Sequence, residues 1–318
     1  MQPIPDGTYQ SPEPTPRRNV ALVLNEKAGA LLGSDGGGGA LRAQLDEKGL
    51  VSLDVPAGDL SDQLAHARGS GADIVLVAGG DGTVACAAQV LHGTGGTLGI
   101  IPLGTMNLLA KDLGIPIGDP AGAIDVVANG VARDIDVAEI RAAGGDGHIF
   151  LCAAMLGSPA RLGHHREDGR RRGNGMAGWW HFARAVDRAR RRHRALPFTV
   201  RVDGVGYRLR TASLTLTVNA LNAGAGNMFG RARLDGRELF VYAVRHRSAM
   251  ELVRVMLHML RGEIAADPAV TVLHGREIEL DSPDAALRVL VDGEEHLLKT
   301  PVHARVLDGC LKVMAPAA

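Results

Sequence analysis

The segment Gly79-Gly80-Asp81-Gly82-Thr83 combines three glycines, a carboxylate and a hydroxyl, directly after the apolar run 74–78 and before a helical pattern. The carboxyl ends of strands in open α/β sheets are where ligands bind. Glycines let the backbone approach phosphate oxygens there, and the next helix offers unpaired amides. A bare carboxylate would repel phosphate, so Asp81 indicates a bridging Mg²⁺ or a hydrogen bond that shapes the loop. The segment predicts a phosphate-binding loop, and the alternative is a simple tight turn.

Two further loops also follow apolar runs. One carries Thr105 and Asn107 within Ile101-Pro102-Leu103-Gly104-Thr105-Met106-Asn107, and the other is Asn25-Glu26-Lys27-Ala28-Gly29. Taken singly, each loop fits a helix cap or a turn as well as it fits a ligand contact. Because parallel neighbouring strands end at the same sheet edge, we expect the three loops to converge.

A late Asp292-Gly293-Glu294 segment supplies two more carboxylates. Phosphoryl transfer to an alcohol needs a carboxylate near the hydroxyl and an in-line phosphate, with Mg²⁺ offsetting the charge. Two carboxylates held at a tight turn could divide these tasks. The alternative is an ordinary exposed hairpin turn, since Asp-Gly is a common signal for one.

The elements that must position these residues fall into two patterns. Up to residue 136, apolar strands alternate with helices, which predicts an α/β domain with a parallel sheet covered on both faces. We expect strands at 20–24, 51–55, 74–78 and 98–101, and helices at 40–48, 60–68 and 84–91. The proline-rich residues 1–18 are typical of a disordered leader.

From residue 137 to 318, successive strands without intervening helices predict a β-rich, antiparallel, sandwich-like or barrel-like domain. The last strand or two can return to the first domain. The expected strands are 149–155, 199–202, 207–217, 239–244, 277–280 and 287–291, and the expected helices are 176–194 and 248–261. For the 248–261 helix we favour a place in the core, and the alternative is a lipid site.

Composition excludes several classes of function. With 35 basic and 35 acidic residues, no overall field selects nucleic acid. Three cysteines without a CxxC pair fit a reducing, cytoplasmic compartment. The chain has no GxxxxGK[ST], HExxH or GxSxG motif, so the P-loop, zinc-protease and serine-hydrolase classes are excluded.

One segment departs from this neutrality. Residues 161–194 contain 11 arginines, three acidic residues and both tryptophans, Trp179 and Trp180. Together with Phe182, this pattern is typical of an amphipathic helix lying on an anionic bilayer. The alternative is a core helix with a solvated arginine face, and nucleic-acid binding is disfavoured because no reader motif accompanies it.

The three loops and the late Asp-Gly-Glu together resemble the soluble bacterial lipid kinases that share the diacylglycerol-kinase catalytic domain, which are related to sphingosine kinases. The resemblance spans about residues 19 to 315. It implies an NAD kinase-like and diacylglycerol kinase-like α/β domain, a β-rich second domain and an ATP site between them. It also implies that Glu294 accepts the proton, beside Asp292, and that Asp81 and Asp235 are tied to Mg²⁺. The nucleotide-binding candidates are Asn25, Gly79, Gly80, Asp81, Gly82, Thr83, Val84, Ala85, Cys86, Thr105 and Asn107.

The sequence therefore predicts a cytoplasmic lipid kinase that uses ATP and Mg²⁺ and associates peripherally with an anionic membrane surface. Ala85-Cys86 stands where the family has a polar Asn-Glu pair, and the segment from Asp235 to Phe240 is a distorted form of the family's Asp-Gly-x-Leu-Asp. Two alternatives therefore stay open: an NAD kinase-like enzyme, and a non-catalytic lipid- or nucleotide-binding homologue. The motifs do not set the oligomeric state, and a homodimer is one option.

Overall fold

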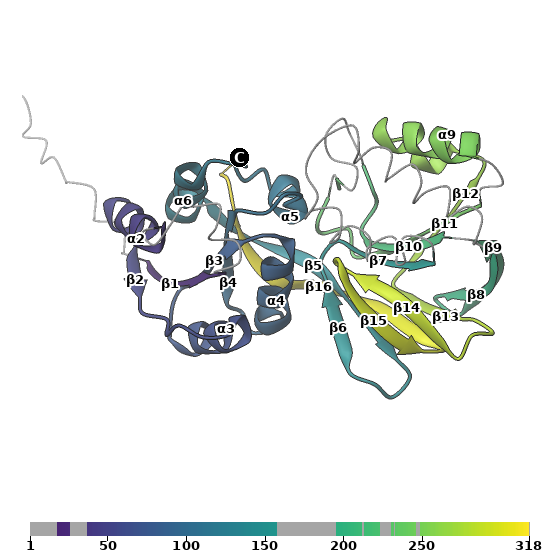
Figure 1. The fold of residues 1–318 in the computed structure, drawn as a ribbon, viewed down its shortest axis with the longest axis horizontal. Coiled ribbons are helices and arrows are strands. Elements are labelled where there is room, and N and C mark those ends of the chain that lie inside the picture. Colours follow the sequence, from purple (N-terminus) through teal and green to yellow (C-terminus); the bar gives the residue numbers. More distant parts are fainter. Residues whose placement is uncertain are drawn as a thin grey trace, which may run out of the picture.

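The structure is a computed structural model that describes residues 18–25, 37–157, 195–211, 213–222, 230–231, 233–245 and 249–317. Two domains lie side by side (Figure 1). The predicted leader, except residue 18, falls outside the described residues, as do Glu26 to Gly29 of the first loop and the basic segment 161–194.

The first domain is built on four parallel strands in the order β2-β1-β3-β4. All six residues of β3 are buried, as expected for a strand covered on both faces. Helices α2 and α6 pack on one face of this sheet, with α3 and α4 on the other (Figure 1). The strands are β1 (Asn19–Leu24), β2 (Val51–Leu53), β3 (Ile74–Gly79) and β4 (Thr97–Pro102), and the helices are α2 (Gly37–Glu47), α3 (Leu60–Gly69), α4 (Asp81–Leu91), α5 (Leu108–Asp112) and α6 (Pro120–Asn129).

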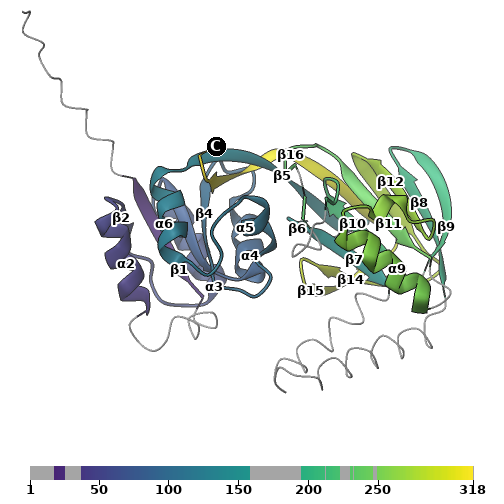
Figure 2. The ribbon, with the colours of Figure 1, turned by 90° about the horizontal axis from the view of Figure 1, so that it is seen from above.

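Two long strands join the domains. β5 (Val131–Ala142) and β16 (Val302–Ala315) run antiparallel to each other from one domain into the other (Figures 1 and 2). At its far end β16 also pairs in parallel with β4, with Val313 opposite Leu98. The parallel strands of the first domain therefore continue into a ten-stranded mixed sheet, and the predicted boundary at residue 136 falls within β5.

The second domain places a six-stranded antiparallel sheet, in the order β12-β11-β10-β7-β14-β15, against the remaining strands of the ten-stranded sheet. Its core includes Phe150, Val200, Leu216 and Val289, drawn from both sheets. The predicted α/β domain followed by an antiparallel sandwich-like domain is thus confirmed. The strands are β6 (Gly147–Phe150), β7 (Ala153–Gly157), β8 (Leu196–Val202), β9 (Val205–Thr211), β10 (Ser213–Val218), β11 (Leu239–Val244), β12 (Val270–Gly275), β13 (Glu277–Asp281), β14 (Ala286–Val291) and β15 (Glu294–Lys299).

Two predicted strands are each divided between the sheets. The strand expected at 149–155 is β6 and β7, and the strand expected at 207–217 is β9 and β10. At the second corner the Thr211 hydroxyl lies 2.7 Å from the carbonyl oxygens of Ser213 and Val244. Strands that switch sheets at such corners keep an apolar pattern on both sides, so the sequence pattern alone does not reveal the break.

Helix α9 (Ala249–Leu260) corrects the expectation of a core helix. Val255 is buried, but Met250, Val253 and Leu257 are 77%, 50% and 45% exposed. Arg254 anchors the helix through an ion pair of 2.9 Å with Asp267, whose pKa falls to about 2 because of this hydrogen bond. The helix therefore packs through one side only.

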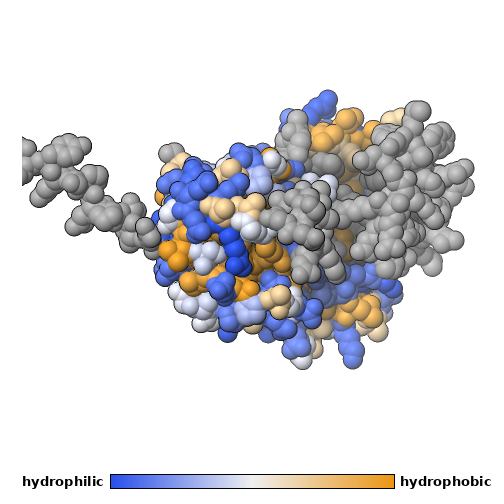
Figure 3. Space-filling view, turned by 60° about the vertical axis from the view of Figure 1, so that its left-hand side comes forward, coloured by the Kyte–Doolittle hydropathy of each residue, from blue (hydrophilic) through white to orange (hydrophobic). Residues whose placement is uncertain are grey.

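Among the described residues, no helix is long and apolar enough to span a bilayer. In the space-filling view that brings the first domain forward, hydrophilic residues alternate with smaller hydrophobic groups (Figure 3).

Candidate functional site

The glycine-rich loop lies where β3 passes into α4. Gly79 ends the strand, and a side chain there would collide with Thr83, one turn into the helix. Gly80 is the N-cap residue of α4 and is extended, with φ −96°. The side-chain Nδ2 of Asn25 donates to the Thr83 hydroxyl over 2.8 Å, so the end of β1 is tied to the same helix.

Asp81 joins this loop to the one that follows β4. Its carboxylate accepts hydrogen bonds from the backbone amides of Asn107, at 2.9 Å, and Leu108, at 2.6 Å. Of the two roles that the sequence left open, the loop-shaping hydrogen bond is therefore present. Each carboxylate oxygen accepts two or more hydrogen bonds or ligands, so Asp81 keeps lone pairs that a metal ion can use.

At Gly104 the backbone of the second loop lies directly against the backbone of the first. A Cβ on Gly104 would lie 2.6 Å from the Gly80 Cα. The backbone of Asn107 is in the left-handed region, with φ 47°. Its side chain accepts a hydrogen bond from the Gly104 amide at 3.0 Å and donates one to the Gly104 carbonyl at 2.7 Å. The expected convergence of the three loops is thus met through Asn25, Asp81 and Asn107, at the carboxyl edge of the sheet.

This close approach yields a first prediction. Gly104→Ala forces the two loops apart, and overpacking of this kind costs about 1–3 kcal/mol of stability. If the loops bind phosphate, we expect ATP affinity to fall roughly tenfold or more, as 1.4 kcal/mol corresponds to tenfold. Thermal denaturation and calorimetric titration with ATP measure the two effects.

Gly39→Ala is the matched control, because nothing lies within 4 Å of a Cβ at that position in α2. Alanine is the better helix former, so we expect this variant to gain stability and keep its ATP affinity. Unchanged ATP affinity in Gly104→Ala would show that the contact between the two loops is not needed for nucleotide binding.

Asp292 holds the turn between β14 and β15. It is left-handed, with φ 44°, and its carboxylate accepts from the amides of Leu151 at 2.6 Å, Cys152 at 3.0 Å and Ala153 at 2.9 Å. Burial raises the pKa of Asp292, while these three amides and the charge of Arg231 lower it. Both oxygens face the protein backbone, so Asp292 fixes the turn, whereas the sequence had paired it with Glu294 as a catalytic carboxylate.

Glu294 is exposed and begins β15. Burial raises the pKa of the Cys86 thiol on α4, and the charge of Glu294 raises it further. Its neighbour on the same face, His296, has a lowered pKa because of burial and the adjacent His148. The two imidazole rings lie 4.0 Å apart.

Contacts between the domains fix this arrangement. Gln89 on α4 accepts a hydrogen bond of 2.8 Å from the Ile149 amide of β6. The helix that starts in the glycine-rich loop therefore packs on the strand that leads to Leu151 and Cys152. Gln89, His148 and His296 were not predicted, since their partners are about 60 or more residues away in the chain.

Comparison with known proteins agrees with this geometry. A family model described as the diacylglycerol kinase catalytic domain matches residues 19–140, and one described as the YegS C-terminal NAD kinase beta sandwich-like domain matches residues 156–315. The chain belongs to the diacylglycerol kinase catalytic-domain family. Together the two matches account for both domains.

Relatives within this family are similar at modest identity. A diacylglycerol kinase from Mycobacterium tuberculosis is 28% identical over 279 residues, covering 86% of this chain and 88% of the relative. A diacylglycerol kinase from Bacillus subtilis is 38% identical over 111 residues, or 33% of this chain and 34% of that protein. A crystal structure of a diacylglycerol kinase from Bacillus anthracis superposes with a TM-score of 0.67 at 18% identity, covering 95% of this chain and 98% of that one, which shows a shared fold.

Not every position carried over from the diacylglycerol kinase family can contact a nucleotide. At the start of α4, Gly82 is exposed and Ala85 and Cys86 are half-buried. Thr105, in the loop after β4, is exposed. The prediction that Val84 contacts the nucleotide is wrong, because its side chain is 5% exposed and its backbone amide donates to the Gly80 carbonyl. Neither group of Val84 is available to a ligand.

Asp235, the second predicted Mg²⁺ residue, does not fit a metal site. Its side chain is 64% exposed and pairs with Arg233 at 3.1 Å. The buried carboxylate nearby is Asp136, which accepts from the amides of Arg237 at 2.6 Å and Gly309 at 2.9 Å. Within the described ranges, no group of three or more His, Cys, Asp or Glu side chains is arranged to hold a metal ion.

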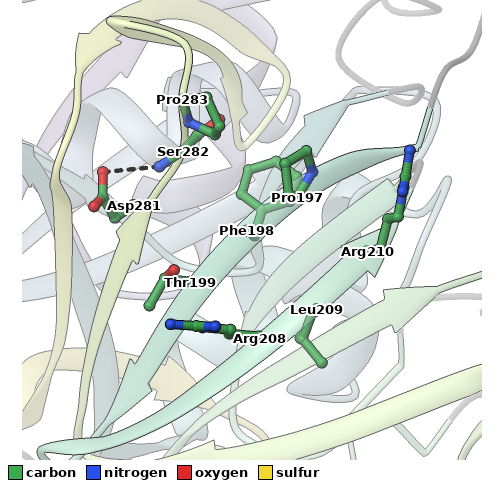
Figure 4. Close-up of a pocket in the computed structure, with 9 residues that line it drawn as sticks. All are labelled: Pro197, Phe198, Thr199, Arg208, Leu209, Arg210, Asp281, Ser282 and Pro283. Carbon is green, nitrogen blue, oxygen red and sulfur yellow. Dashed lines mark hydrogen bonds between the residues drawn. The ribbon is translucent and has the colours of Figure 1, made fainter.

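A hollow of about 540 Å³ lies elsewhere, beside β8 and β9. Phe198, Thr199 and the arginines 208 and 210 line one side, and the turn after β13 lines the other, where the Asp281 carboxylate faces the Ser282 amide (Figure 4). No described residue of the candidate site contributes to it, so it belongs to the second domain alone.

Proposed function

We propose that this member of the diacylglycerol kinase catalytic-domain family transfers the γ-phosphate of ATP to a lipid hydroxyl, of the diacylglycerol or sphingosine type. The observation that carries the proposal is the place of Glu294. The exposed Glu294 begins β15, the His296 ring of β15 lies 4.0 Å from the His148 ring of β6, and β6 is hydrogen bonded to α4 through Ile149 and Gln89. Phosphate-binding loops and a carboxylate base across a domain junction are the parts that phosphoryl transfer to an alcohol requires.

In this mechanism the loops of the first domain bind the phosphates. The start of α4 presents backbone amides beside the close approach of Gly80 and Gly104, and a helix N-terminus favours negative charge. Asp81 and Asn107 keep the two loops together while the nucleotide enters and leaves. The residues therefore position phosphate mostly through backbone, consistent with the apolar Ala85 and the weakly polar Cys86.

Glu294 then takes the proton from the attacking lipid hydroxyl. Asp292 keeps the turn in its left-handed conformation, so that Glu294 leaves the turn at a fixed place. Mg²⁺ bound with the nucleotide, with Asp81 as its protein ligand, would supply compensation of the phosphate charge.

The proposal includes peripheral contact with an anionic bilayer, where such a lipid resides. The basic residues 161–194, with Trp179 and Phe182, were predicted to make this contact, and they lie outside the described residues. Three further predictions stay predictions: that the protein is cytoplasmic, that it does not bind nucleic acid, and that it can form a homodimer.

An acceptor panel tests the proposal. ADP release is measured with ATP and Mg²⁺ in the presence of anionic vesicles without acceptor, with diacylglycerol, or with sphingosine, and separately with NAD. We expect ADP release above the blank only with a lipid acceptor. NAD-dependent release would replace the proposal with NAD kinase activity, and the absence of ADP release with every acceptor would favour a non-catalytic homologue.

A further inference from the structure

Arg231 is a buried arginine at the junction of the two domains, and it belongs to none of the motifs that pointed to function. Its side chain and that of Asp112 are each 1% exposed. The guanidinium Nε and Nη2 both lie 2.8 Å from Asp112 Oδ2, and the Arg231 backbone amide donates to Asp112 Oδ1 over 3.1 Å. The pair connects α5 of the first domain to a segment of the second.

The same guanidinium reaches the residues that Asp292 holds. Arg231 Nη1 donates to the Leu151 carbonyl and, over 3.3 Å, to the Val218 carbonyl, while Nη2 lies 3.5 Å from Cys152 Sγ. Leu151 and Cys152 donate their amides to the Asp292 carboxylate. Arg231 and Asp292 therefore hold one bend of backbone from its two sides.

At the other end, α5 is fixed to the phosphate loops. Asp81 accepts the amides of Asn107 and Leu108, which begin this helix, and Asp112 is its last residue. A helix of five residues leaves little freedom between the two ends. A continuous set of contacts thus runs from Asp81 through α5, Asp112 and Arg231 to the backbone bend that carries Asp292.

The charges in this set lie close together in a buried region. Burial raises the pKa of the Cys152 thiol well above its ordinary value, Arg231 opposes this, and Asp292, Asp112 and Asp81 add to it. Buried ion pairs contribute little net stability compared with apolar packing, because desolvation offsets their attraction. The directional hydrogen bonds of a guanidinium, in contrast, fix geometry.

We propose that Arg231 and Asp112 are positioning residues that set the place of the Asp292–Glu294 turn relative to the phosphate loops. This role rests on the phosphoryl transfer proposed above. Glu294 is two residues from Asp292, so a shift of the Leu151–Cys152 bend moves the base with respect to the phosphate. Misplacement by about 1 Å can cost about 100-fold in rate.

The test uses the double variant Asp112→Asn/Arg231→Met, because removing one charge alone would leave the other buried and unpaired. We expect it to fold and to bind ATP with a KM within about twofold of wild type, and its kcat to fall roughly 10- to 100-fold. Hydrogen exchange at the amides of Leu151, Cys152 and Ala153 should become faster. The control is Lys48→Met/Asp125→Asn, which neutralises an exposed pair of 2.7 Å between the turn after α2 and α6, and it should change neither readout.

A folded double variant with wild-type kcat and wild-type exchange at these amides would overturn the proposal, since a purely structural pair predicts that result. If the double variant does not fold, Arg231→Lys replaces it: lysine keeps the charge but cannot make the same set of contacts, so the same losses are expected. If the wild-type protein phosphorylates no lipid, the proposed function fails. Exchange at residues 151–153 then decides the positioning role by itself.

Discussion

Glu294→Gln is expected to lower kcat about 10²- to 10⁴-fold while leaving ATP affinity unchanged. Glutamine keeps the shape of the side chain but cannot accept the proton of the lipid hydroxyl. The phosphates bind to backbone of the other domain, so the Kd for ATP should stay the same. Steady-state kinetics on diacylglycerol vesicles and calorimetric titration with ATP measure the two quantities.

Glu295→Gln is the matched control. It makes the same chemical change one residue later, where the side chain pairs with Arg288 on the surface. Exposed pairs contribute about 0–1 kcal/mol, so kcat and stability should be close to wild type. Equal losses in both variants would contradict a specific role for Glu294.

The position of Glu294 has a consequence that does not depend on activity. Its negative charge raises the pKa of the Cys86 thiol, so Glu294→Gln should lower that pKa. More thiolate is then present at a given pH, and Cys86 should be alkylated faster. Alkylation by iodoacetamide as a function of pH, with the modified cysteine located by mass spectrometry, measures the shift; an unchanged pH profile would place Glu294 away from α4.

Asp81→Ala is expected to lower kcat by 100-fold or more and also to destabilise the protein by about 2 kcal/mol. The rate falls because the carboxylate sets both phosphate loops and can hold Mg²⁺. Stability falls because the amides of Asn107 and Leu108 lose a charged acceptor. Kinetics and urea denaturation measure the two losses.

Asp119→Ala separates cap loss from catalysis. The Asp119 side chain accepts from the Gly122 amide at 2.9 Å at the start of α6. Its removal should cost about 0.5–2 kcal/mol of stability and leave kcat unchanged. If Asp81→Ala behaves like Asp119→Ala, then Asp81 is only a cap, and the phosphate-loop assignment is wrong.

The first domain could be predicted well because its signals are local. The apolar run of β3 followed directly by glycines placed Gly79, Gly80 and Asp81 at a strand end before any contact was known. α6 was missed, although Asp119 and Pro120 together form a helix start with a hydrogen-bonded cap. The end of this helix is also marked in the sequence, by the C-cap residue Gly130 directly before β5.

The second domain was predicted in class but not in detail. β5, β12, β15 and β16 are absent from the predicted strands; four of the six residues of β15 are polar or charged, and the long strands β5 and β16 pair with partners that are distant in sequence. β16 pairs with β5 at a separation of 160 residues or more. Such pairings depend on tertiary contacts rather than on local propensity.

The candidate site divides in the same way. Asp81, Asn107 and Glu294 were found through motifs, since each stands in a short segment with its own turn chemistry. Arg231 and Asp112 were not, because each is an ordinary charged residue until the fold places them 2.8 Å apart and away from solvent. The role of Asp292 was not predicted either, because its carboxylate accepts hydrogen bonds from residues such as Cys152, 140 positions away in the chain.

The destination of the γ-phosphate tests the central claim most directly. The protein is incubated with ATP labelled in the γ-phosphate, Mg²⁺ and anionic vesicles that contain diacylglycerol, and the organic and aqueous phases are then separated and counted. Phosphoryl transfer to the lipid hydroxyl predicts label in an organic-phase phosphate monoester of the lipid for the wild type, and at least 100-fold less label for Glu294→Gln. Label that stays entirely in the aqueous phase, as ATP, inorganic phosphate or a phosphorylated nucleotide, would contradict it.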